Sequence, residues 1–131
     1  MMAKGLMDFA ADAREKVEEI TTEDAAKMTS DSSDLLVLDV REPGEVAEGH
    51  LPHAVNVPRG LLEAKADLEY PHRDPKLADR HQPIIVYCAS GVRSLLASQT
   101  LQEMGFTQVK SLAGGFMAWK SEGRTVVGES W

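Results

Sequence analysis

The chain has 131 residues, of which 43% are apolar and 27% charged, and this is enough to build one globular domain with its own core. Its formal net charge of −7 disfavours nonspecific binding to nucleic acid or to anionic lipid, and its single cysteine excludes an internal disulfide. No signal peptide or transmembrane stretch is recognisable, so we expect a cytoplasmic protein in a reducing compartment, with no membrane or nucleic-acid partner.

The first predicted elements are a helix, an edge strand and a second helix. Apolar residues recur at helical spacing among charged ones, at Leu6, Phe9, Ala10, Ala13 and Val17. They predict an amphipathic helical extension over residues 1–16, ahead of the main domain at 17–131. This helix can cover an edge of the core or pair with another copy to give a homodimer. Residues 17–21 favour an edge strand, and Thr22 is a good helix start.

The rest of the chain alternates between predicted strands and helices. Strands are predicted at residues 35–38, 54–57, 84–87 and 109–112, and helices at 43–48, 61–68, 94–104 and 115–122. The continuous apolar run at 35–38 is typical of a strand buried on both faces of a parallel sheet. Such alternation predicts a mostly parallel α/β sheet flanked by helices.

Polar side chains follow three of these strands. Asp39 and Arg41 follow the first, Arg59 follows the second, and the segment from Cys88 to Arg93 follows the third. The carboxyl ends of parallel strands meet at one edge of a sheet, where the sites of such folds lie. We therefore expect a single pocket around the cysteine.

Cys88 stands where an apolar strand runs into a short loop and then a helix. The loop and first helical turn supply backbone amides from Ala89, Ser90, Gly91, Val92, Arg93 and Ser94. Amides at a helix start favour the nucleophilic thiolate form of a cysteine. Gly91 permits a tight turn, Ser94 can cap the helix or bond the sulfur, and Arg93 can bind an oxyanion or hold the loop closed. The alternative is an inert, buried cysteine that only fills space.

Three ordered motifs resemble those of a known family. The first comprises LDVREP at residues 38–43, then Glu45, then GHLPHAVNVP at 49–58; the last is LAGGFMAW at 112–119, with the Cys88 loop between them. Together they resemble the signatures of single-domain rhodaneses.

This resemblance covers about residues 17–122 and implies a three-layer α/β fold. It implies a central, mostly parallel five-stranded sheet, with the active cysteine after the fourth strand. The implied activity is sulfur transfer without a metal or organic cofactor. Cys88 takes a sulfur atom from thiosulfate or a persulfide and passes it to cyanide or a thiol, and a protein can serve as donor or acceptor. From the residues themselves, we expect the loop amides, Arg93 and Arg59 to bind the substrate; Asp39 and Arg41 resemble family positions that brace the loop.

One departure bears on the donor. Thiosulfate enzymes of the family often carry cationic side chains early in the loop, where this chain has Ala89 and Ser90. The departure predicts that thiosulfate is a poor donor and favours a protein or small-molecule persulfide.

Other functions remain open. Cysteine phosphatases use a similar loop with five residues between cysteine and arginine, whereas four separate Cys88 from Arg93, so a phosphatase or arsenate reductase is disfavoured. A non-catalytic interaction module of the same fold is a second alternative. His50 and His53 have a spacing that suits a metal, but no further ligands complete a set, so we interpret them as loop histidines.

Overall fold

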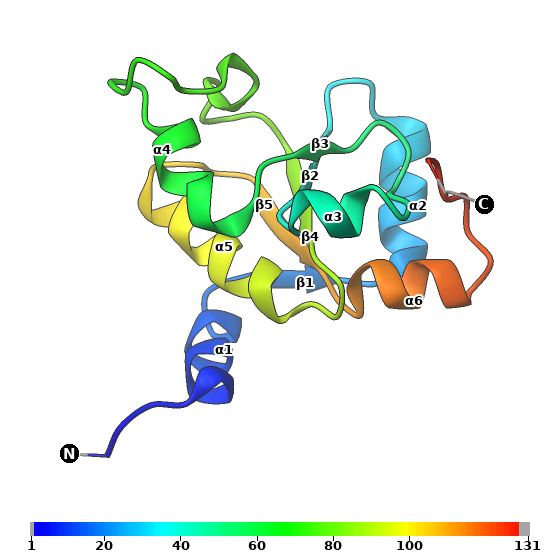
Figure 1. The fold of residues 1–131 in the computed structure, drawn as a ribbon, viewed down its shortest axis with the longest axis horizontal. Helices are drawn as coiled ribbons and strands as arrows, with labels where there is room; N and C mark the ends of the chain where they lie inside the picture. Colours follow the sequence, from blue (N-terminus) through cyan, green and yellow to red (C-terminus); the bar gives the residue numbers. More distant parts are fainter. Residues whose placement is uncertain (1, 129–131) are drawn as a thin grey trace.

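A five-stranded parallel sheet forms the centre of the computed structural model, which describes residues 2–128 (Figure 1). Its strands are β1 (Glu18–Ile20), β2 (Leu36–Asp39), β3 (Val55–Asn56), β4 (Ile84–Tyr87) and β5 (Val109–Leu112). They lie in the order β1-β5-β4-β2-β3, and every neighbouring pair is parallel. Met1 and residues 129–131, which the predicted extension and main domain include, lie outside the described residues.

Helices cover both faces of the sheet. They are α1 (Leu6–Arg14), α2 (Thr22–Asp31), α3 (Pro43–Val46), α4 (Leu62–Ala66), α5 (Val92–Glu103) and α6 (Gly115–Ser121), with 3₁₀ turns at Arg59–Leu61 and Pro75–Leu77. Figure 1 shows α4 and α5 on one side of the sheet and α2 and α6 on the other. This is the predicted three-layer α/β fold. None of the helices in the described part of the chain is both long and apolar enough to cross a membrane.

The central strands β2 and β4 are buried at every position. The apolar run at residues 35–38 predicts this burial for β2 up to Leu38, and Asp39, which ends the strand, is buried as well. Successive side chains point to opposite faces and fill two cores. One core joins the sheet to α4 and α5 and includes Leu38, Val86, Leu62 and Leu101. The other joins it to α2 and α6 and includes Val37, Ile85, Ala25 and Trp119. Because helices pack on both faces of β4, the loop that follows β4 begins from a fully buried strand.

The N-terminal helix α1 is shorter than residues 1–16. It begins at Leu6 because the Asp8 carboxylate accepts a hydrogen bond from the Gly5 N–H (2.8 Å), and residues 2–4 are not helical. Ala10 and Ala13 pack against Leu95 of α5, so α1 covers an edge of the core. Its outward side chains, Leu6, Met7 and Phe9, remain about half exposed or more.

Candidate active site

The carboxyl ends of β2, β3 and β4 meet at one edge of the sheet. Asp39 at the end of β2 pairs in register with Tyr87 at the end of β4 and with Asn56 of β3. The Asn56 amide also donates to the backbone oxygens of Asp39 and Arg41, both at 2.9 Å. Cys88 follows Tyr87 directly, so the sheet places the cysteine beside the polar segment that follows β2.

The Cys88 sulfur is buried and faces the start of α5. Its exposed fraction is 1%, and it accepts hydrogen bonds from the backbone N–H groups of Gly91 (3.1 Å) and Ser94 (3.3 Å). The thiol donates to the Ser94 hydroxyl at 3.5 Å. The two amide N–H groups directed at one sulfur stabilise negative charge on that atom.

The loop reaches this geometry through a left-handed residue and a close backbone approach. Gly91 has φ +107°, and a Cβ there would lie 3.3 Å from the Gly114 nitrogen. A Cβ on Gly115 would overlap the carbonyl oxygens of Cys88 and Ala89. These two carbonyls accept hydrogen bonds from the first amides of α6, Phe116 N–H (2.8 Å) and Met117 N–H (3.0 Å). The carbonyl groups of Cys88 and Ala89 therefore point toward α6, whereas the N–H groups of Gly91 and Ser94 point toward the Cys88 sulfur.

A second hydroxyl, on Ser111 of β5, supports the first. Ser111 is fully buried and donates to the Ser94 hydroxyl at 2.9 Å, while Ser94 donates to the Gly91 carbonyl at 3.1 Å. Sequence reasoning did not single out Ser111. It could have been found as a hydroxyl two residues after the buried Val109, because side chains two apart in a strand point to the same face and a buried hydroxyl needs a partner.

Asp39 and Arg41 form a buried ion pair at the carboxyl end of β2. Arg41 donates to both Asp39 oxygens, with Nη2 at 2.8 Å from Oδ2, and to the Gly49 carbonyl at 2.8 Å. The Tyr87 hydroxyl donates to Asp39 Oδ2 at 2.6 Å. The Arg41 guanidinium lies over the Phe116 ring, 4.3 Å from its centroid. The pair therefore links β2, β4 and α6, which carry the loop and its carbonyl partners.

Arg93 points its guanidinium at α3. Both terminal nitrogens bind the Glu45 carboxylate, at 2.8 and 2.9 Å. This pair lowers the pKa of Glu45 to about 2. The same hydrogen bond raises the pKa of Arg93, and the charge of Cys88 acts in the same direction. Arg93 thus ties α5 to α3 beside the sulfur, and its charge is largely compensated.

Arg59, the other predicted cation of the site, is engaged elsewhere. It pairs with Glu63 at 2.9 Å and donates to the Thr100 hydroxyl at 3.0 Å. Thr100 lies nearly two helical turns beyond Ser94 along α5. Of the residues predicted to bind substrate, Gly91 and Ser94 contact the Cys88 sulfur, whereas Arg59 is directed toward α4 and Thr100 of α5.

No group of three or more His, Cys, Asp or Glu side chains among residues 2–128 is arranged to hold a metal ion. His50 places its Nδ1 atom 2.8 Å from the Leu51 carbonyl, and its backbone pairs with Val127. His53 lies in a turn with φ +61°. These contacts are those of loop residues.

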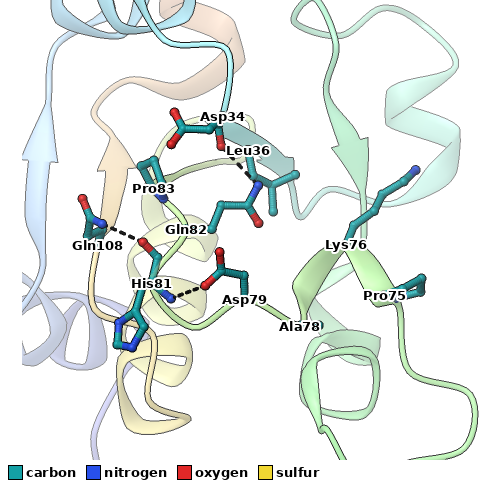
Figure 2. A pocket seen from close by; sticks show the side chains of 10 residues that line it. All are labelled: Asp34, Leu36, Pro75, Lys76, Ala78, Asp79, His81, Gln82, Pro83 and Gln108. Atoms are coloured by element: carbon teal, nitrogen blue, oxygen red, sulfur yellow. Dashed lines mark hydrogen bonds between the residues drawn. The ribbon is translucent and has the colours of Figure 1, made fainter.

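A hollow of about 570 Å³ lies at the opposite edge of the sheet (Figure 2). It is lined by residues at the amino ends of β2, β4 and β5, including Leu36, Pro83 and Gln108. The side chains of Gln82 and Gln108 donate to the backbone carbonyls of Asp34 and His81 across it. It is separated from Cys88 by the length of the strands and has no part in the cysteine site.

The chain is similar to known proteins in sequence and in fold. The family model of the rhodanese-like domain matches residues 21–122. A sulfurtransferase of Allochromatium vinosum is 32% identical over 111 residues, which cover 85% of this chain and 95% of that protein. Thiosulfate sulfurtransferase GlpE of Coxiella burnetii is 35% identical over 88 residues, covering 67% of this chain and 74% of that protein.

Solved structures share the fold. A Rhodopseudomonas palustris protein of unknown function, described as a possible tyrosine phosphatase, superposes with a TM-score of 0.89 at 33% identity, covering 96% of each chain. The human single-domain sulfurtransferase TSTD1 superposes with a TM-score of 0.70 at 24% identity, covering 81% of this chain and 97% of that one, and supports the fold alone.

Proposed function

The chain belongs to the rhodanese-like domain family, and from this premise we propose that it is a sulfurtransferase in which Cys88 carries the sulfur as a persulfide. The observation that carries the proposal is the pair of amides, from Gly91 and Ser94, directed at the buried Cys88 sulfur. The named sulfurtransferase relatives support the class of reaction.

In the first half-reaction the Cys88 thiolate attacks the outer sulfur of the donor. With thiosulfate, a Cys88–sulfur bond forms, the sulfur–sulfur bond of the donor breaks, and sulfite leaves with the electron pair. With an organic persulfide the leaving group is the thiolate. In each case the enzyme is left with a Cys88 persulfide anion, and the Gly91 and Ser94 amides are placed to stabilise charge there.

In the second half-reaction an acceptor takes the outer sulfur. Cyanide attacks it to give thiocyanate, or a thiolate attacks it to give a new persulfide, and the Cys88 thiolate returns. The loop can serve both halves because the negative charge stays on sulfur throughout. Such a double displacement predicts ping-pong kinetics.

Mass spectrometry of the intact protein tests the proposal. After incubation with thiosulfate or an organic persulfide, the wild type should gain the mass of one sulfur atom, and cyanide should remove it. Cys88→Ser should gain none, with retained thermal unfolding showing that the variant is folded. A wild type that never gains sulfur from either donor would favour the non-catalytic interaction module instead.

A phosphatase is the second candidate, because the Rhodopseudomonas palustris relative is described as a possible tyrosine phosphatase. Two observations disfavour it here. Four residues separate Cys88 from Arg93, and both terminal nitrogens of Arg93 bind Glu45. We expect no Cys88-dependent hydrolysis of p-nitrophenyl phosphate and no arsenate reduction; activity in either assay would reverse the order of the two proposals.

A further inference from the structure

The Cys88 loop contains a single charged side chain, Arg93, and the charge of that side chain is compensated by a residue outside the loop. Glu45 binds it through two parallel hydrogen bonds of 2.8 and 2.9 Å, the bidentate geometry in which an arginine binds a carboxylate most strongly. The pair uses two of the five N–H groups of an arginine. The remaining three can still bond a donor molecule, but the net positive charge that would attract an anion is gone.

The Glu45 carboxylate is held in this position from its own side as well. Its Oε1 atom accepts a hydrogen bond from the backbone N–H of Glu42 at 3.0 Å, which caps α3. The segment that leads into α3 is fixed by the buried pair of Asp39 and Arg41. The low pKa of Glu45, caused first by Arg93, keeps this carboxylate ionised throughout the neutral range. The compensating charge is therefore a built part of the site.

We propose that Glu45 is a specificity-determining residue that makes the site favour monoanionic organic sulfur donors, such as thiosulfonates and the persulfides of thiols, over dianionic thiosulfate. The inference rests on the proposed sulfurtransferase function and names its class of donor. The physical reason is that the attraction of a site to a donor scales with the product of their charges. A site that lacks net positive charge therefore loses twice as much electrostatic attraction energy with a dianion as with a monoanion.

Methanethiosulfonate allows the effect of the donor's charge to be measured separately from the chemistry of the transfer. It resembles thiosulfate with one charged oxygen replaced by a methyl group, and it reacts in the same way: the Cys88 thiolate takes the outer sulfur, and methanesulfinate leaves with the electron pair. Glu45→Gln removes the charge but keeps an oxygen that can accept from the Glu42 N–H. The measurement is kcat/KM with each donor, with cyanide as acceptor.

In Glu45→Gln we expect kcat/KM to rise about tenfold for thiosulfate and about threefold for methanethiosulfonate, so that their ratio rises about threefold. The ratio is independent of the fraction of folded enzyme, because both donors report on the same molecules. The increase should shrink at 0.5 M salt, since exposed charges are screened.

Glu19→Gln is the matched control, because Glu19 also pairs with an arginine, Arg14, at 2.8 Å, but on the edge strand β1. It should leave the ratio unchanged. A ratio that stays constant or falls in Glu45→Gln, or that rises equally in Glu19→Gln, overturns the inference. If wild-type Cys88 acquires no sulfur from either donor, the proposed function itself fails, which is a different result.

Discussion

Two arginine–carboxylate pairs lie near Cys88, and they differ chiefly in their contact with water. Arg41 and Asp39 are 3% and 0% exposed, whereas the side chains of Arg93 and Glu45 are 37% and 35% exposed. Both pairs have short hydrogen bonds, so geometry does not distinguish them. Burial does, because removing one partner of a buried pair leaves a charge without water, while solvent compensates a half-exposed one.

The two pairs also connect different parts of the molecule. Arg41 and Asp39 join the polar ends of β2 and β4 through Tyr87 and reach the Gly49 carbonyl. Glu45 and Arg93 join α3 to the first turn of α5, directly after the cysteine loop. The comparison predicts that the buried pair maintains the framework of the site, whereas the half-exposed pair sets its charge at little cost in stability.

Arg41→Met should have the largest effect. It leaves Asp39 buried without its cationic partner, which costs about 3–5 kcal/mol in the free energy of unfolding. Urea denaturation of the wild type and the variant measures this loss. Arg93→Met, which removes the cation of the half-exposed pair, should cost less than about 1 kcal/mol.

A double variant shows whether the loss in Arg41→Met comes from the uncompensated charge. Asp39→Asn combined with Arg41→Met removes both charges, and it should recover at least about 1 kcal/mol relative to Arg41→Met alone. Equal losses in Arg41→Met and Arg93→Met would remove the distinction between the two pairs.

Tyr87→Phe should have the next largest effect. The Tyr87 hydroxyl donates to Asp39 at 2.6 Å and accepts from the Leu51 N–H at 3.1 Å. Burial, together with the charge of Asp39, raises the pKa of Tyr87 above its usual value, so the hydroxyl stays protonated and able to donate. Its removal should cost about 1.5–3 kcal/mol, because it leaves a buried carboxylate short of a donor.

Tyr70→Phe is the matched control for this change. Tyr70 is 40% exposed, and the loss of its hydroxyl should alter the free energy of unfolding by less than about 0.5 kcal/mol. Thermal or urea unfolding measures both variants. If Tyr87→Phe is as mild as Tyr70→Phe, the buried network contributes far less than its hydrogen bonds suggest.

The sheet and the cysteine loop could be predicted from local sequence. The apolar runs at residues 35–38 and 84–87 predicted two strands, which lie at Leu36–Asp39 and Ile84–Tyr87, so the first prediction was one residue early and the second was confirmed. Gly91 between Cys88 and Ser94 indicated the tight turn, and the structure has φ +107° there. These features depend on residues within a few positions of one another, where the pattern carries the information.

The contacts between distant segments could not be predicted in this way. Glu45 and Arg93 are 48 residues apart, as are Asp39 and Tyr87, so their pairing depends on strand order and register. Ser111 reaches Ser94 only because β5 lies beside β4 under α5. Arg59 follows a strand, as the predicted pocket required, yet Glu63 is four residues away and offers a nearer partner.

Glu45→Gln should have a smaller effect on stability than Arg41→Met or Tyr87→Phe, and its dependence on pH identifies the cause. The pKa of Glu45 is about 2 in the folded protein, below its ordinary value of 4.5, so the folded state binds this proton less readily than the unfolded state. The stabilisation is therefore fully present above about pH 4.5 and disappears as the pH falls toward 2. Because the pair is about one-third exposed, we expect it to contribute less than about 1 kcal/mol.

The measurement is the difference in unfolding free energy between wild type and variant, from urea titrations at several values of pH between 7 and 2. It should be constant above pH 5 and fall steadily as the pH drops from about 4.5 toward 2. A difference that persists unchanged to pH 2 would mean that the charge of the pair contributes nothing. Glu45 would then stabilise α3 through the hydrogen bond that it accepts from the Glu42 N–H, a bond that the amide oxygen of Gln accepts more weakly.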